Sequence, residues 1–172
     1  AKEGMAPGGQ IHGDMFRLPF FAVSSYCLVA PALGMAWGAL QSYIDEIRVS
    51  EVRSLTGGTS KLASYDAVQT RVAQASGLID AATELILRDC RDVTKSTLTG
   101  RQISVEQRTR NKRDQALAVR FAKDAVQMII EGTGAKGLYK DQPIQRAWRD
   151  LQAAGSHITL SWDILMPAHG RV

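Results

Sequence analysis

The stretch from Leu18 to Ile44 constrains the fold of this chain more than any other feature, because it contains no charged residue. A helix of this length could cross a lipid bilayer, and Gly34 and Gly38 have the spacing found in some membrane helix pairs. Two prolines and several hydroxyl side chains interrupt the stretch, however, and the remaining helices are amphipathic and need a protein core. We therefore expect a central helix surrounded by other helices, with no membrane contact.

Hydrophobic periodicity predicts two long helices in the first part of the chain. The first is expected over residues 16–55, with a kink or division at Pro31 and a stop at Gly57 and Gly58. The second is expected over residues 61–98, where apolar residues recur in alternating steps of four and three. This spacing predicts a seam that packs against neighbouring helices. The seam consists of Val68, Val72, Ala75, Ile79, Ala82 and Ile86.

Two further helices are predicted in the second part of the chain. The third opens at Ser104, which forms a capping box with Gln107. Its expected core positions are Val119, Ala122, Val126 and Ile129. The fourth begins near Pro143, a favoured first-turn residue, and ends before Pro167. Its expected buried stripe is Ile144, Trp148, Leu151, Ile158, Trp162 and Leu165.

These patterns predict an all-α, up-down-up-down four-helix bundle, since no run shows the alternation of a β-strand and short glycine-marked loops join the helices. Residues 1–14 contain five glycine or proline positions that break any helical period, and they predict a linker. We expect this linker to follow a preceding domain, and residues 15–172 to form the helical domain.

Composition and charge favour an ordinary soluble surface. The net charge is +4, from 21 basic and 17 acidic residues, and the basic cluster between Arg101 and Arg113 lacks interleaved aromatic residues, so nucleic-acid binding is not expected. We expect this cluster to be the solvated first turn of a helix. Cys27 and Cys90 lie in apolar helical segments and are expected to be buried. No disulfide framework, metal site or signal peptide is apparent, which favours a cytoplasmic location.

Three features could support chemistry. His157 lies on the predicted fourth helix at the edge of its apolar stripe, where an imidazole could transfer protons or serve only the structure. The break from Gly132 to Gly137, with Thr133 and Gly134, could hold an anion through backbone amides or be a plain turn. Arg53, predicted in the last turn of the first helix, could bind a phosphate or simply complement the helix dipole.

Several segments together resemble two-component flavin-dependent monooxygenases, which are aromatic hydroxylases built on the acyl-CoA dehydrogenase fold. The most specific segment is residues 143–150, Pro-Ile-Gln-Arg-Ala-Trp-Arg-Asp, followed by His157. Residues 30–39 and 108–116 resemble the openings of the first and third helices of that family's C-terminal domain. Residues 53–57, Arg-Ser-Leu-Thr-Gly, are similar to a segment that holds flavin phosphate across a subunit boundary. The resemblance covers nearly the whole chain.

The resemblance implies a bundle domain that encloses half of a flavin site. A partner flavin reductase would supply reduced flavin, either FMN or FAD, and His157 would withdraw or hydrogen-bond the phenolic proton of a small aromatic substrate. Arg53, Thr133 and Gly134 would bind the cofactor, and the bundles would associate as a homo-oligomer, expected to be a tetramer. Arg146, Arg149 and Asp150 are expected to form a structural ion network, with Trp148 and Trp162 in the core.

Two alternatives stay open at this stage. Acyl-CoA dehydrogenases share the fold, but many of them place a glutamate base where this chain has residues 138–142, Leu-Tyr-Lys-Asp-Gln. Another branch carries its base at the position of Ser24. The absence of a carboxylate at either position disfavours a dehydrogenase, although Asp141 lies nearby. The second alternative is a non-catalytic helical module that serves oligomerisation.

Overall fold

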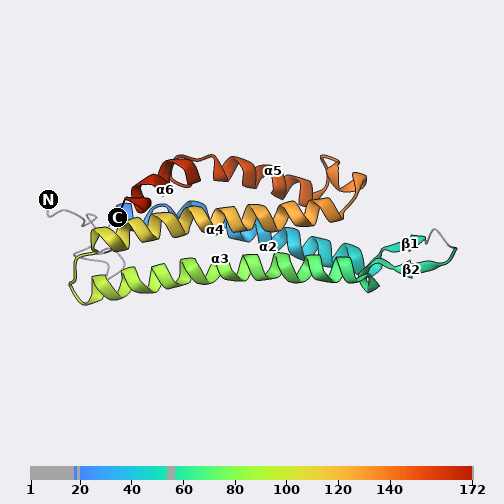
Figure 1. Ribbon diagram of the computed structural model, residues 1–172, viewed down its shortest axis with the longest axis horizontal. Coiled ribbons are helices and arrows are strands. Elements are labelled where there is room, and N and C mark those ends of the chain that lie inside the picture. Colours follow the sequence, from blue (N-terminus) through green and yellow to red (C-terminus); the bar gives the residue numbers. More distant parts are fainter. Residues whose placement is uncertain (1–17, 19, 54–56, 172) are drawn as a thin grey trace.

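A computed structural model describes residues 18, 20–53 and 57–171 of the protein (Figure 1). The predicted linker, residues 1–14, lies outside the described residues. The described chain is an antiparallel bundle of four long helical segments, α2 (Tyr26–Val49), α3 (Asp66–Leu98), α4 (Val105–Gly132) and α5 (Pro143–Gly155). Short helices stand before and after them, α1 (Phe20–Val23) and α6 (Trp162–Gly170). The predicted all-α up-down-up-down bundle is confirmed.

The first predicted helix differs from the structure at both ends. The chain breaks at Ser24 and Ser25, between α1 and α2, whereas Pro31 lies inside an uninterrupted α2. Pro31 removes the backbone hydrogen bond that residue 31 would donate to the Cys27 carbonyl, and α2 continues past this position. At the other end α2 stops at Val49, before the predicted limit at residue 55.

A β-hairpin follows α2, where the sequence had indicated no strand. Strands β1 (Glu51–Arg53) and β2 (Thr59–Lys61) pair antiparallel, with Val52 opposite Ser60. Gly57 and Gly58 have φ angles of 86° and 121°, which favour glycine, and they help to return the chain. A 3-10 turn, η3 (Leu62–Ser64), then leads into α3. The hairpin projects beyond one end of the bundle (Figure 1).

The buried core runs between α2, α3, α4 and α5. The predicted seam of α3 is buried except for Val72, which is partly buried and packs against the core. All four predicted core positions of α4 are buried as well. Alanines predominate where the helices face one another and allow their backbones to approach closely. They include Ala32, Ala36 and Ala39 of α2, Ala75 and Ala82 of α3, and Ala118, Ala122 and Ala125 of α4.

Helix α2 is the one helix of the described chain that is long and apolar enough to cross a membrane by length and composition. It contributes eight buried residues to the bundle core, among them Val29, Leu40 and Tyr43. Only 39% of its apolar window is buried within the described chain, and Leu28 and Trp37 are exposed. The bundle core therefore accounts for one face of the uncharged stretch, and the expectation that other helices surround α2 on all sides is wrong.

The third predicted helix begins as expected. The amide of Gln107 donates a hydrogen bond of 3.1 Å to Ser104 Oγ, so Ser104 caps α4. The fourth predicted helix is wrong in its second half, because α5 ends at Gly155 and α6 starts only at Trp162. Pro167, expected to lie beyond the last helix, stands inside α6.

Candidate functional site

His157 lies in the turn between α5 and α6 and not on a continuous helix. The amide of His157 donates to the Ala154 carbonyl at 3.2 Å, which closes the end of α5. The His157 carbonyl accepts hydrogen bonds from the amides of Leu160 and Ser161, both at 2.8 Å. The side chain of Leu160 is 2% exposed and anchors the turn in the core. Ile158, predicted to be buried, is instead 64% exposed beside His157.

The imidazole of His157 is exposed and contacts one neighbouring residue. Its Nδ1 atom lies 2.9 Å from Thr159 Oγ1 and 3.3 Å from the backbone nitrogen of Thr159. Among the described residues, no protein group makes a hydrogen bond to Nε2. The ring therefore has open surface beside it, as a residue that meets a cofactor or substrate requires.

Arg53 ends strand β1, opposite Thr59, so its predicted place in the last turn of a helix is wrong. The chain leaves the helical conformation at Ser50, whose φ and ψ of −79° and 138° are extended. Arg53 is exposed, and within the described ranges no ion pair engages its guanidinium. Because an arginine of this kind offers paired donors to a phosphate, Arg53 fits the role of a flavin-phosphate ligand.

The glycine-rich loop after α4 has a tightly fixed conformation. Thr133 caps the helix, since its amide and its Oγ1 both donate to the Ile130 carbonyl, at 3.2 and 2.7 Å. Gly134 has a φ of 64°, and a side chain at Gly137 would overlap Thr133 Oγ1. The loop continues into a 3-10 turn, η4 (Ala135–Leu138). The donors of Thr133 are therefore already used, and Gly134 is the exposed member of the predicted pair.

The structure separates these candidates into two places. The α4–α5 loop and the hairpin with Arg53 lie toward the same end of the bundle, where Lys136 also pairs with Glu46 of α2 at 3.8 Å (Figure 1). The α5–α6 turn with His157 lies away from that end, along the side of α4 (Figure 1). One chain therefore does not bring His157 together with Arg53, Thr133 and Gly134.

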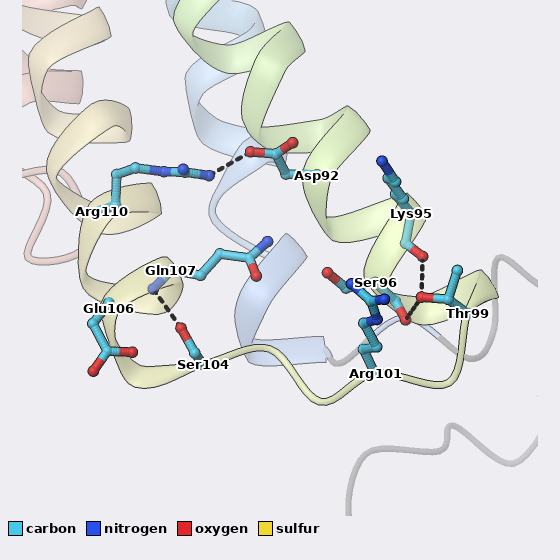
Figure 2. Close-up of a pocket in the computed structure, with 9 residues that line it drawn as sticks. All are labelled: Asp92, Lys95, Ser96, Thr99, Arg101, Ser104, Glu106, Gln107 and Arg110. Carbon is cyan, nitrogen blue, oxygen red and sulfur yellow. Dashed lines mark hydrogen bonds and ion pairs between the residues drawn. The ribbon is translucent and has the colours of Figure 1, made fainter.

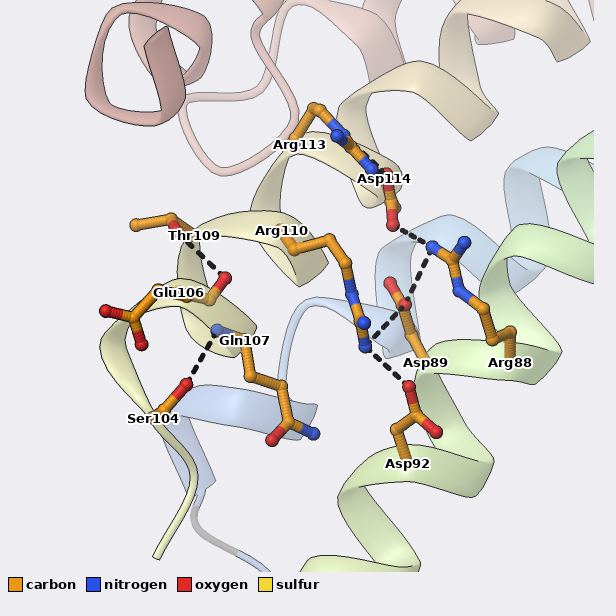
Figure 3. Close-up of polar contacts among 10 residues, drawn as sticks. All are labelled: Arg88, Asp89, Asp92, Ser104, Glu106, Gln107, Thr109, Arg110, Arg113 and Asp114. Carbon is orange, nitrogen blue, oxygen red and sulfur yellow. Dashed lines mark hydrogen bonds and ion pairs between the residues drawn. The ribbon is translucent and has the colours of Figure 1, made fainter. Parts of the chain in front are cut away.

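A charged cluster that the sequence did not reveal links α3 to α4 (Figure 3). Asp89 and Asp114 are both fully buried. Arg88 donates to both of them, at 3.2 Å to Asp89 and through a short contact to Asp114. Arg113 Nε donates to Asp114 Oδ1 at 2.7 Å, and Arg110 lies 3.7 Å from Asp89. The expectation of a solvated basic turn is therefore wrong for Arg110 and Arg113, which are partly buried by these carboxylates.

The surroundings of Asp89 shift its proton affinity. Burial is the main cause and the neighbouring Asp114 carboxylate adds to it, while Arg88 and Arg110 oppose it; together they raise the pKa of Asp89 to about 6. Lys112, which donates to Ser25 Oγ at 2.6 Å, has its pKa lowered by burial. The cluster thus links α3 to α4 through buried charges, and Lys112 links α4 to Ser25, the N-cap residue of α2.

A polar hollow of about 430 Å³ lies between the end of α3 and the start of α4 (Figure 2). Lys95, Arg101 and Arg110 line it together with Asp92 and Glu106. Arg110 donates to Asp92 at 2.6 Å, so part of this charge is internally paired. None of the predicted site residues lines this hollow, which lies at the end of the bundle opposite the hairpin (Figure 1).

The other predicted residues have mixed outcomes. Asp150 lies 3.6 Å from Arg146 and 3.7 Å from Arg149, which confirms the expected ion network. Trp148 and Trp162 are only partly buried, so their predicted place in the core is met in part. Trp148 Nε1 donates to Gln127 at 2.8 Å, and the guanidinium carbon of Arg120 lies 4.9 Å from the centre of the Trp162 ring.

The two cysteines, and the two positions at which acyl-CoA dehydrogenases carry their base, do not form a second candidate site in the described structure. Cys27 is exposed and Cys90 partly buried, so the expectation that both are buried is wrong. Asp141 is exposed on the loop before α5, and Ser24 lies at the break between α1 and α2. Among the residues that the structure describes, no group of three or more His, Cys, Asp or Glu side chains could hold a metal.

Comparisons with known proteins agree with this architecture. A family model described as "Acyl-CoA dehydrogenase, C-terminal domain" matches residues 26–162. The oxygenase component of an FADH(2)-dependent resorcinol hydroxylase from Rhizobium sp. (strain MTP-10005) is 36% identical over 95% of this chain. The oxygenase component of p-hydroxyphenylacetate 3-hydroxylase from Acinetobacter baumannii is 26% identical over 98% of it.

A solved structure gives the same result. The 3-HSA hydroxylase from Rhodococcus sp. RHA1 superposes with a TM-score of 0.82 and 26% identity over 96% of this chain. The chain spans 42% of that structure, and 42% and 38% of the two relatives named above. The similarity therefore covers nearly all of this chain and less than half of each whole protein.

Proposed function

Because the chain belongs to the family of acyl-CoA dehydrogenase C-terminal domains, we propose that it is the helical part of a flavin-dependent oxygenase that hydroxylates a phenol or a related small aromatic molecule. The family includes dehydrogenases as well, so the fold alone does not select the reaction. Relatives named as hydroxylases of resorcinol and of p-hydroxyphenylacetate support the oxygenase branch, and both names describe phenols.

The observation that carries this proposal is the exposed imidazole of His157. It stands in a turn anchored by the buried Leu160, with the ring open to the surface. An imidazole can hold or accept a proton near neutral pH, which is what activation of a phenol requires. The dehydrogenase reaction needs a base that removes a proton beside a thioester carbonyl. Asp141 is exposed on a loop, where its carboxylate accepts a hydrogen bond of 3.5 Å from the neighbouring Gln142, and this position does not favour that role.

The flavin that we propose is FAD, in its reduced form, delivered by a partner flavin reductase, in line with the FADH(2)-dependent relative. When bound, reduced flavin supplies the activation of O₂. Within this chain, Arg53 would hold a flavin phosphate, Gly134 would let the cofactor approach the backbone, and Thr133 would fix the loop through its bonds to Ile130.

The separation of His157 from Arg53 supports an oligomeric site. We propose that His157 and Arg53 of one chain contact two different flavin molecules, so that each site takes one residue from each of two chains. We therefore propose a homo-oligomer, expected to be a tetramer, in which the projecting hairpin reaches a neighbouring subunit. The mass of the assembly in light scattering tests this arrangement directly.

The activity is tested with the complete protein that contains this chain. With NADH, FAD and a flavin reductase it should consume O₂ and convert a phenol to a hydroxylated product. The His157→Ala variant should still bind flavin but release hydrogen peroxide in place of product, whereas the control Ile158→Ala should keep most of its product yield. Unchanged product yield in His157→Ala would remove His157 from the mechanism. Reduction of an artificial acceptor by an acyl-CoA would instead establish a dehydrogenase.

A further inference from the structure

Thr159 makes two contacts to the same ring nitrogen of His157. Its backbone nitrogen lies 3.3 Å from Nδ1, and its hydroxyl oxygen lies 2.9 Å from the same atom. A backbone N–H can only donate. Nδ1 must therefore act as an acceptor, which an imidazole nitrogen can do only when it carries no proton. The hydroxyl of Thr159 then also donates to Nδ1, because the unprotonated nitrogen has no hydrogen to offer in return.

The turn holds this arrangement in place from both sides. The His157 carbonyl accepts from Leu160 and Ser161, so the backbone between His157 and Ser161 is closed on itself. On the far side α6 is attached to α4 by the stacking of Arg120 on Trp162 and by a contact of 3.1 Å between Arg113 and His169. The Thr159 amide is thus presented to the ring by a fixed backbone, and the hydroxyl adds a second donor at the same point.

From this geometry we propose that Thr159 is a positioning residue, which keeps the proton of the neutral His157 ring on Nε2 and turns the exposed ring atom into a hydrogen-bond donor. The inference rests on the proposed function for its catalytic meaning. An Nε2–H donor recognises an oxygen that accepts, so the ring would bind the ionised oxygen of a phenolate. It would not act first as the base that removes the phenolic proton.

A second histidine provides an internal reference. Arg113 Nη1 lies 3.1 Å from His169 Nε2, and a guanidinium has donors only. Nε2 of His169 must then accept, so the neutral ring of His169 carries its proton on Nδ1. The structure therefore assigns opposite tautomers to His157 and His169 within the same chain.

The tautomers can be read by ¹⁵N NMR of this chain labelled at its histidine rings, at a pH where the rings are neutral. The chain has 3 histidines, and His157→Gln identifies the signals of that residue. Thr159→Val keeps the backbone amide and the side-chain shape but removes the hydroxyl, while Thr159→Ser retains the hydroxyl. A hydroxyl can donate to Nδ1 or accept from it, whereas the backbone amide, which both variants keep, can only donate. We therefore expect Nε2–H to be the main form of His157 in the unaltered chain and in both variants, and Nδ1–H to be the main form of His169 in all three.

A protonated Nδ1 as the main form of His157, in the unaltered chain or in Thr159→Ser, would overturn the proposal. The same two variants in the complete protein test the catalytic meaning. Thr159→Val should lower the fraction of consumed O₂ that appears as hydroxylated product, with flavin binding unchanged, and Thr159→Ser should restore it. If the NMR result is as expected but the complete protein with its reductase forms no hydroxylated product, the proposed function fails while the tautomer assignment stands.

Discussion

Replacement of Asp114 by alanine should destabilise the bundle far more than replacement of Asp92, although both carboxylates receive arginine donors at the same end of the molecule. Asp114 is fully buried and accepts from Arg88 and, at 2.7 Å, from Arg113 (Figure 3). The side chain of Asp92 is 41% exposed and accepts from Arg110 alone, at 2.6 Å. The two substitutions thus remove the same chemical group from a buried and from a solvated position.

The expected magnitudes follow from these surroundings. Truncation of one partner of a buried charge pair costs roughly 3–5 kcal/mol. Three features of the cluster lower that figure: the side chains of Arg88 and Arg113 are 41% and 32% exposed, Arg88 keeps its bond to Asp89, and the repulsion between the two buried carboxylates disappears. We therefore expect a loss of about 3 kcal/mol for Asp114→Ala, at the lower limit of that range. An exposed pair contributes about 0–1 kcal/mol, which sets the expectation for Asp92→Ala.

Urea unfolding followed by circular dichroism measures both free energies of unfolding. The comparison is valid if the slope against urea concentration is the same for both variants, because the slope reports the surface exposed on unfolding. Losses that agree within about 0.5 kcal/mol, the usual scatter of surface substitutions, would refute the reasoning that burial decides the strength of these contacts.

Three further predictions concern single positions. The raised pKa of Asp89 means that the folded state binds its proton more tightly than the unfolded chain, so this group's contribution to stability is complete below about pH 4 and is lost as the pH rises through about 6. Asp89→Asn should therefore gain about 2 kcal/mol relative to the unaltered chain between pH 4 and 7, as followed by urea unfolding at each pH, and a constant difference would contradict the shift. Gly137→Ala should cost about 1–3 kcal/mol in thermal unfolding, because its methyl group would overlap the preceding turn. Gly77→Ala, in open space within α3, should instead stabilise the chain by about 0.5–1 kcal/mol, and equal effects at both glycines would contradict this account. In the complete protein, Arg53→Ala should weaken flavin binding roughly tenfold or more in a titration, since bonds to charged groups contribute about 1.5–3 kcal/mol, while Arg48→Ala should leave it unchanged.

The sequence predicted the helices best where one face is buried along the whole length. The seam of α3 and the core positions of α4 could be identified because each apolar side chain contacts a neighbouring helix, which enforces the helical period. The N-cap at Ser104 was equally predictable, since it depends only on residues a few positions apart. Local chemistry and continuous burial are properties that a sequence records directly.

The hairpin could not be predicted in this way. All three residues of β1 and all three of β2 are exposed, so neither strand has a buried face that would impose alternation. The error in the fourth helix has a related cause. Its apolar spacing continues past Gly155, but the turn changes the register, so that Leu160 is buried and Ile158 is exposed. The spacing of apolar residues alone cannot reveal a turn after which a different apolar residue, here Leu160 and not Ile158, occupies the buried position.

The charged cluster was missed for a different reason. Asp114 and its partner Arg88 are 26 positions apart, on different helices. The sequence shows the local concentration of arginines around residue 110 but not the carboxylates that face them. The candidate site follows the same rule: His157 could be named from a motif, whereas the orientation of its ring depends on Thr159 and on the turn between α5 and α6.

The separation of His157 from Arg53 leads to a prediction about mixed assemblies of the complete protein. If each flavin site takes its histidine from one subunit and its arginine from another, His157→Ala and Arg53→Ala chains can complement one another. The two variants are co-expressed in equal amounts, each with its own affinity tag, and should mix at random. A site is intact when its histidine comes from an Arg53→Ala chain and its arginine from a His157→Ala chain. That combination occurs in about a quarter of the sites of a symmetric oligomer. Because the double tag excludes assemblies of a single variant, doubly tagged tetramers should regain slightly more than this, about 0.3 of the original product yield, at a flavin concentration where each variant alone is inactive. No recovery in assemblies shown to contain both chains would place the two residues in a site within one chain, or would remove one of them from the flavin site altogether.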